Sequence, residues 1–298
     1  MTLPEPEQVL VETRDGTMLR ADVWDRADAR ATLVLAHAMM ASRRTFVRGE
    51  HGGLAGFLHR RGWRVVTFDF RGHGESGTPA ARGGDWSYDD LVRDDFPTIV
   101  AALRERLGGP IVPVGHSLGG HVALAAQGLG ALDADAIVLL AANVWLPFLE
   151  PSFRKRIAKH VVLEAAARIG ERLGHVPIRR LGVGSDDEAR GYFQAFARWW
   201  RSSRWTSDDG RDDYVRALGE VRCPVLAMAC AGDRFAAPPD HARAFAELVG
   251  TTDRTFEALD ERRLGYRGGH MELVTDERSA PAWDAIDRWL DARVSGRR

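Results

Sequence analysis

Cysteine is scarce in this chain of 298 residues, which contains only two. Cys223 and Cys230 stand at the two ends of one predicted strand, and the rise of a β-strand separates them by roughly 23 Å. A disulfide needs Cα atoms within about 7 Å of each other, so these two residues cannot pair. We therefore expect two buried thiols and a reducing compartment.

Long apolar runs and a strong net charge are also missing. No uninterrupted apolar stretch reaches the ~18 residues of a membrane-spanning helix. Residues 1–7 are acidic and rich in proline, whereas a signal peptide begins with a basic segment followed by an apolar one. The formal net charge is −1, which argues against a general nucleic-acid-binding protein. These absences predict a cytoplasmic protein that has no membrane span and binds no nucleic acid, and they leave the oligomeric state open.

The sequence does contain a regular alternation of apolar strands and helical segments. Hydrophobic residues make up 45% and charged residues 28% of the chain, which is typical of a globular protein with a sizeable core. A hairpin that turns at Asp15–Gly16 comes first. The alternation predicts a mostly parallel sheet with helices on both faces. The expected strands are 8–13, 18–24, 32–37, 63–70, 111–114, 136–141, 224–229 and 254–259, and the expected helices include 54–61, 89–107, 239–249 and 276–294.

This alternation is interrupted between residues 143 and 219. Pro151–Arg204 shows helical periodicity without a strand pattern, and it carries twelve Lys and Arg residues against five Asp and Glu residues. We expect a core made of residues 1–142 and 220–298, with a helical cap inserted at 143–219. The aromatic residues of the cap form either its own core or an apolar roof over a substrate pocket. Its basic excess is either a solvated surface or a device that steers an anionic substrate.

A Gly-x-Ser-x-Gly motif centred on Ser117 follows the apolar run 111–114 and precedes an alanine-rich helical segment. A strand, a sharp turn and a helix are the context in which this motif forms a nucleophile elbow. Gly115 and Gly119 lack a Cβ atom, so the strand and helix backbones can pass closely at a strained turn. The pattern predicts that Ser117 is a nucleophile, and the plain alternative is a glycine-rich turn with an incidental serine.

A nucleophilic serine needs a base within about 3 Å and a group that orients this base. In the chain order Ser, acid, His, the acid follows a strand beyond the elbow. Asp233 comes directly after the buried run 224–229, so we expect it to be that acid rather than an ordinary turn or capping aspartate. His270 lies in a Gly-Gly-His loop and is the only histidine after the last predicted strand, so we expect it to be the base.

Acyl transfer also needs two backbone N–H donors that stabilise an oxyanion. Leu118, directly after the nucleophile, and Met39, in the loop after strand 32–37, are the expected donors. We expect Met40, His116 and Trp145 to contact the substrate. This chemistry requires neither a metal ion nor an organic cofactor.

Together these motifs resemble those of the α/β-hydrolase superfamily, and within it the group of monoacylglycerol lipases and serine aminopeptidases. The resemblance implies an α/β-hydrolase fold with a mostly parallel eight-stranded sheet, and it implies structural roles for Asp69 and His73. The family usually has glycine where this chain has Ala38, so we expect a differently shaped oxyanion loop. The stretches that carry the resemblance are 37–40, 68–77, 115–120, 232–238 and 269–270.

The predicted triad of Ser117, Asp233 and His270 indicates a serine hydrolase. Its expected reaction is cleavage of a carboxylic ester or thioester of a small acyl substrate, free or attached to a carrier, through an acyl-enzyme intermediate. An acyltransferase or a C–C bond hydrolase would use the same triad. The alternative from another class is a non-catalytic small-molecule-binding protein on the same fold, because a fold alone does not define a function.

Overall fold

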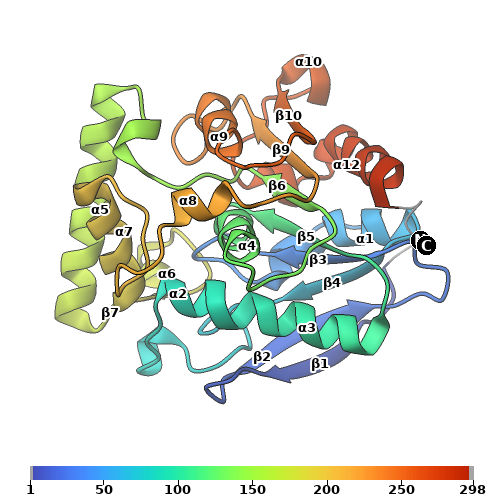
Figure 1. Ribbon diagram of the computed structural model, residues 1–298, viewed down its shortest axis with the longest axis horizontal. Helices are drawn as coiled ribbons and strands as arrows, with labels where there is room; N and C mark the ends of the chain where they lie inside the picture. Colours follow the sequence, from blue (N-terminus) through green and yellow to red (C-terminus); the bar gives the residue numbers. More distant parts are fainter. Residues whose placement is uncertain (1–2, 295–298) are drawn as a thin grey trace.

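The computed structural model describes residues 3–294 and has an eight-stranded sheet at its centre (Figure 1). The strand order is β1-β2-β4-β3-β5-β6-β9-β10. Strands β4, β3, β5, β6, β9 and β10 run parallel to one another, whereas β2 pairs antiparallel with both β1 and β4 at one edge. The bounds are β1 Glu7–Glu12, β2 Met18–Trp24, β3 Thr32–Ala36, β4 Arg64–Phe68, β5 Ile111–His116, β6 Ile137–Leu140, β9 Val225–Cys230 and β10 Arg254–Leu259.

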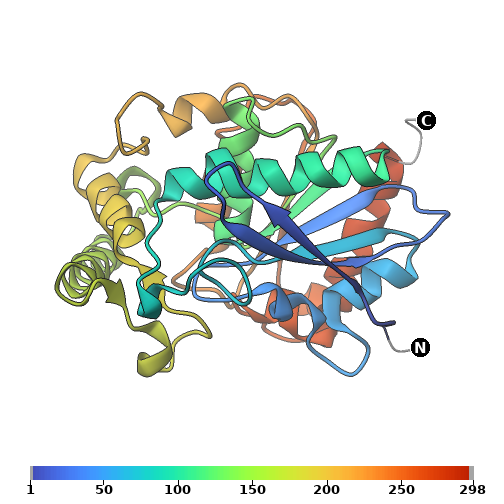
Figure 2. The same ribbon diagram turned by 90° about the horizontal axis from the view of Figure 1, so that it is seen from below.

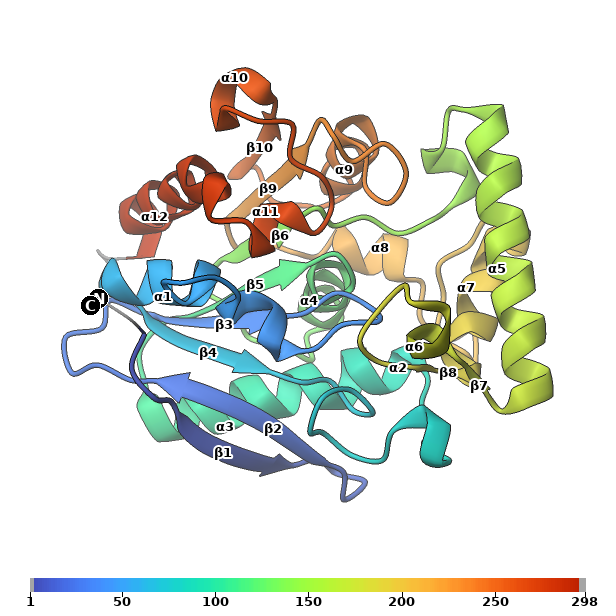
Figure 3. The same cartoon turned by 180° about the vertical axis from the view of Figure 1, so that it is seen from behind.

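The four central strands β3, β5, β6 and β9 are buried along their whole length, as their continuous apolar sequences require. Helices cover both faces of the sheet, and Figure 3 shows α1 and α12 on the face opposite to α3 and α4. The alternation of strands and helices in the sequence therefore predicted the fold class correctly. The helices around the sheet are α1 Gly53–Arg60, α2 Tyr88–Asp90, α3 Phe96–Leu107, α4 Leu118–Gly128, α9 Pro239–Ala246, α10 Glu261–Leu264, α11 Glu272–Thr275 and α12 Ala280–Val294.

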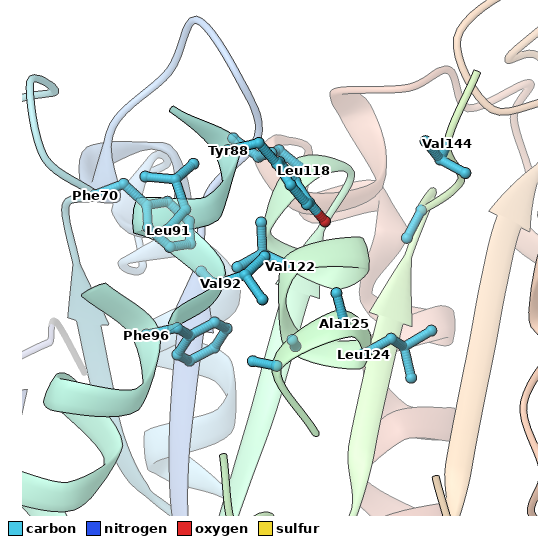
Figure 4. Close-up of a cluster of buried hydrophobic side chains, with 14 of the residues drawn as sticks. Phe70, Tyr88, Leu91, Val92, Phe96, Leu118, Val122, Leu124, Ala125 and Val144 are labelled. Atoms are coloured by element: carbon cyan, nitrogen blue, oxygen red, sulfur yellow. The ribbon is translucent and has the colours of Figure 1, made fainter. Parts of the chain in front are cut away.

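Two apolar clusters lie on the two faces of the sheet. Figure 4 shows part of the first one, in which Phe96 and Val122 lie between α3 and α4 and Tyr88 lies near Leu118. The second cluster contains Trp63 and Trp283, both almost fully buried. Because α4 begins directly after Ser117, the packing of this helix against the sheet fixes the position of the turn before it.

The chain between β6 and β9 forms the helical insertion, by which we mean residues 143–219. Figures 1 and 2 show its helices α5 and α7 at one end of the molecule, away from both termini. The sequence predicted helices but no strands here, and this was incomplete, because two two-residue strands pair antiparallel within it. Its elements are α5 Phe153–Leu173, β7 His175–Val176, α6 Ile178–Leu181, β8 Glu188–Ala189, α7 Arg190–Ser202 and α8 Tyr214–Leu218.

Two local features accompany elements whose bounds the sequence predicted closely. The helix expected over 89–107 contains a π-helical turn, Leu91–Asp95, which brings the buried Asp95 carboxylate to Arg71. The last strand ends at Leu259 because Asp260 accepts a hydrogen bond from the Arg263 N–H and begins the short helix α10.

The two cysteines form no disulfide, as expected, but only Cys230 is buried. Cys223 is partly exposed because it lies before the start of β9. No helix among residues 3–294 combines the length and the apolar character needed to cross a membrane.

Candidate active site

Ser117 occupies a strained turn between β5 and α4, with φ 50° and ψ −110°. A residue other than glycine is uncommon at positive φ, and such strain persists only where the surrounding structure enforces it. Close contacts at the two flanking glycines show that the surrounding backbone holds this turn in place. A Cβ atom on Gly115 would lie 2.3 Å from the Gly120 nitrogen, and one on Gly119 would lie 2.2 Å from the Ala36 carbonyl oxygen. The turn therefore has the geometry that the Gly-x-Ser-x-Gly motif predicts.

Asp233 follows β9, and its buried carboxylate accepts four hydrogen bonds. The backbone N–H groups of Phe235, Ala236 and Ala237 donate at 3.2, 2.9 and 2.8 Å, and the fourth donor is His270. Burial alone would raise the pKa of Asp233, but these donors outweigh it and lower the pKa below its ordinary value. The carboxylate is therefore ionised and held in one orientation.

His270 lies in the loop between α10 and α11, and its Nδ1 is 2.6 Å from Oδ2 of Asp233. The loops that carry the two residues approach closely, because the Gly232 N–H donates to the Gly268 carbonyl over 3.0 Å. A Cβ atom on Gly232 would lie only 2.3 Å from that carbonyl oxygen. With Nδ1–H donating to the carboxylate, Nε2 of His270 is the ring nitrogen that can accept a proton.

His116, which precedes Ser117 and which we expect to contact the substrate, is fully buried. Its Nε2–H donates to the His270 carbonyl oxygen at 3.0 Å, and the two rings are 5.0 Å apart. Burial first, and the nearby His270 second, lower the pKa of His116 to about 3, so the ring is neutral. The residue before the nucleophile therefore anchors the loop that carries the imidazole.

The structure joins Asp233 and His270 directly and brings Ser117 next to them through His116. The Ser117 hydroxyl is partly exposed and forms no side-chain hydrogen bond within the described part of the chain, while its own N–H donates to Leu140 over 2.9 Å. A serine whose side chain lacks a hydrogen-bond partner within the described residues, one residue from a histidine bound to the His270 loop, is placed where a base could activate it.

Within residues 3–294, the peptide N–H groups of Leu118 and Met39 donate to no protein acceptor, and neither does that of Ala38 in the same loop as Met39. The loops that carry them are tied together, because the Gly119 N–H donates to the His37 carbonyl at 3.1 Å. The buried His37 ring braces the second loop, with Nδ1–H donating to the Ala38 carbonyl oxygen at 2.7 Å and Nε2 accepting from the Phe70 N–H at 3.1 Å. The N–H groups of Leu118 and Met39 are available to a bound oxygen atom.

The oxyanion loop, by which we mean residues 37–40 where we expect the donor Met39, has its positive φ at Met40. The φ of Met40 is 60°, and Ala38 is not at positive φ. Both backbone groups of Met40 are bound by the helical insertion, since its N–H donates to Glu188 Oε1 at 2.5 Å and its carbonyl accepts from the Ser185 N–H at 2.8 Å. The sequence analysis missed Glu188, because it offers no motif and follows two other acidic residues, as a surface residue would.

Trp145 connects the insertion to the Asp233 loop. Its Nε1–H donates to the Ala236 carbonyl at 2.9 Å, and its ring meets that of Phe235 edge to face at 5.3 Å. Lys159, which the sequence did not single out, is fully buried beside it, with Nζ 4.9 Å from the Trp145 ring centre and 2.9 Å from the Glu150 carboxylate. These contacts fix one end of the insertion close to the buried acid.

Within residues 3–294, no cluster of three or more histidine, cysteine or acidic side chains is arranged to hold a metal ion. The groups that the described site offers for chemistry are the serine, the imidazole with its carboxylate, and the peptide N–H groups. A serine on a strained elbow at the carboxyl edge of a parallel sheet, beside a histidine–carboxylate pair, is the arrangement of serine hydrolases built on an α/β fold.

The comparisons with known proteins agree with this class. Residues 33–290 match the alpha/beta hydrolase family, and because the match spans most of the chain, this protein belongs to that family of hydrolases. No curated protein matches the chain. Three solved structures share the fold at 15–19% sequence identity.

These structures cover almost all of this chain. An esterase from Thermogutta terrifontis has a TM-score of 0.64 at 19% identity, with 97% of this chain and 99% of that chain covered. A monoacylglycerol lipase from Paleococcus ferrophilus has a TM-score of 0.61 at 18% identity, with 92% and 99% covered. The Pyrococcus furiosus esterase Pf2001 has a TM-score of 0.61 at 15% identity, with 97% and 93% covered.

Proposed function

We propose that this hydrolase cleaves a carboxylic ester or thioester of a small acyl substrate, with Ser117 as nucleophile, His270 as base and Asp233 as the orienting acid. The observation that carries the proposal is the 2.6 Å contact between His270 Nδ1 and the Asp233 carboxylate, next to the strained turn at Ser117. A family member without catalytic chemistry has no need for an ionised, buried carboxylate that fixes a histidine tautomer.

The geometry supports a two-step reaction. His270 Nε2 takes the proton of the Ser117 hydroxyl as its oxygen attacks the acyl carbon, and the N–H groups of Leu118 and Met39 stabilise the oxyanion. His270 then protonates the leaving alcohol or thiol, and an acyl group remains on Ser117. A water molecule, deprotonated by the same nitrogen, releases the acid. Asp233 keeps Nδ1 protonated throughout, so Nε2 always faces the reaction.

We also propose that the helical insertion acts as a cap, and that Met40 and Trp145 contact the acyl group of the substrate. Both side chains are partly exposed, and both residues lie where the insertion meets the loops after β3 and β9. The names of the similar esterases and the monoacylglycerol lipase agree with an ester substrate.

The test is a panel of p-nitrophenyl esters and acyl-CoA thioesters of increasing acyl length, assayed with the wild-type protein and with Ser117→Ala. We expect hydrolysis of at least one series and its loss in the variant. A fluorophosphonate probe is expected to label Ser117 in the wild-type protein and to label His270→Ala far more slowly. Full hydrolytic activity in Ser117→Ala would disprove the proposal.

A further inference from the structure

Residues 184–188 of the helical insertion form hydrogen bonds and a close backbone contact with the oxyanion loop. Glu188 Oε1 accepts the Met40 N–H at 2.5 Å, and the Ser185 N–H donates to the Met40 carbonyl at 2.8 Å. The two backbones touch at Gly184, where a Cβ atom would lie 2.4 Å from the Met40 carbonyl oxygen. The insertion therefore holds both polar backbone groups of one residue in this loop.

Met40 has a strained backbone conformation, which its hydrogen-bond partners help to maintain. Its φ of 60° is an unfavourable conformation for a non-glycine residue, so the loop would relax if its partners were removed. Met39, whose N–H we assign to the oxyanion, is the residue directly before it. A change of backbone conformation at Met40 is therefore expected to displace the Met39 N–H as well.

Glu188 is suited to this task because it is fully buried and is itself fixed by His73. His73 Nε2 lies 3.1 Å from the same Oε1 that binds Met40, and its Nδ1 donates to the Arg71 carbonyl at 2.9 Å. Since both ring nitrogens face acceptors, His73 carries two protons and a positive charge. A carboxylate beside an oxyanion would oppose catalysis, and the imidazolium neutralises its charge.

We propose that Glu188, supplied by the helical insertion and paired with His73, is a positioning residue that holds the oxyanion loop in its active conformation. The inference rests on the proposed function, because it assigns a role to residues around the same site. It predicts a loss that appears in kcat, since oxyanion donors act on the transition state far more than on the bound ester.

The experiment compares Glu188→Ala and Glu188→Gln with the wild-type protein, using p-nitrophenyl butyrate as substrate and an alkyl trifluoromethyl ketone as an inhibitor that forms a tetrahedral adduct. Asp85→Ala is the matched control. Asp85 binds Arg190 and the Gly191 N–H of the same part of the insertion, but it does not touch Met40. Hydrogen exchange of the peptide that covers residues 37–41 reports the loop directly and needs no activity.

For Glu188→Ala we expect kcat to fall about 10- to 100-fold with KM within twofold, and the inhibition constant of the ketone to rise in parallel. Exchange of the 37–41 peptide should become faster. Glu188→Gln keeps an oxygen at the position of Oε1, so it should recover most of kcat even if the alanine variant folds poorly. Asp85→Ala should stay within twofold of the wild-type kcat.

The inference fails while the proposed function stands in two cases, provided that the wild-type protein hydrolyses esters through Ser117. In the first case Glu188→Ala keeps kcat within twofold of the wild-type value, and in the second Asp85→Ala lowers kcat as much as Glu188→Ala does. A change confined to KM, or unchanged exchange of the 37–41 peptide, would overturn it as well. If Ser117→Ala is as active as the wild-type protein, the proposed function fails and the inference fails with it. One set of measurements therefore distinguishes failure of the inference from failure of the proposed function.

Discussion

The buried pair of His73 and Glu188 should make folding stability depend on pH in the alkaline range. Burial alone would lower the pKa of His73, but the Glu188 carboxylate and the Arg71 carbonyl outweigh it and raise the pKa to about 9. In the unfolded chain the ordinary value is about 6.5. Because the folded state binds the proton more tightly, this histidine stabilises the protein fully below pH 6.5, and the contribution disappears as the pH rises through 9.

The size of the effect follows from the difference between the two pKa values. A shift from the ordinary value to about 9 corresponds to roughly 3 kcal/mol of folding free energy below pH 6.5. Between pH 6.5 and pH 9 most of this contribution is lost. We therefore expect the free energy of unfolding to fall by about 2 to 3 kcal/mol over this interval because of His73 alone.

Urea unfolding at half-unit steps between pH 6 and pH 9.5, monitored by tryptophan fluorescence, measures this slope. His73→Gln and Glu188→Gln serve as comparisons, because the first removes the proton-binding group and the second removes the charge that raises its pKa. Both should be less stable than the wild-type protein at pH 6.5 and closer to it at pH 9. If the wild-type protein and both variants lose stability in parallel, the assignment of a charged His73 is wrong.

Three further predictions concern the site and its surroundings. Asp233→Asn should lower kcat about 10³- to 10⁴-fold while the protein stays folded, because an amide cannot hold the required tautomer of the base; equal rates at saturating ester would contradict this. Gly119→Ala should be poorly folded in thermal unfolding, since its Cβ would lie 2.2 Å from a carbonyl oxygen of β3, whereas Gly170→Ala, with contacts at 3.4 Å, should be neutral or slightly stabilising. Lys159→Ala should cost about 3 to 5 kcal/mol in urea unfolding, because it removes the cation nearest to the buried Glu150 carboxylate and leaves only His241 and the Ser152 N–H beside it; a change below 1 kcal/mol would show that the pair contributes little.

The part of the fold that the sequence predicted is the part with strong periodicity. The buried strands and the long final helix appear close to their expected bounds, and β10 appears at Arg254–Leu259 as expected. The proximity of Asp233 to His270 also followed from the pattern, because Asp233 comes directly after one strand and His270 lies in the chain that follows the neighbouring strand, at the same edge of a parallel sheet. The roles of these residues, and those of Ser117, Leu118 and Met39, stay proposals.

The features that the sequence did not predict depend on contacts between distant segments. Glu188 lies in a strand of two residues, which is too short to show any alternation, and its burial follows from its pairing with His73 115 positions earlier. The positive φ of Met40 likewise depends on partners in the insertion. The hydrogen bond of the His116 ring to the His270 loop was not predicted either, because it joins a buried strand to a loop 154 positions later.

The helical insertion is connected to the sheet at two neighbouring strands. The chain leaves after β6 and returns as β9, and these two strands are direct neighbours, with Leu140 paired to Met228. The connection between them therefore does not change the order of the strands in the sheet, and lengthening a loop costs little entropy. Exchanging this module would require a replacement that again offers a buried acceptor to the amide of Met40 and that fills the apolar cluster in which Trp199 and Trp205 now pack beside Tyr88.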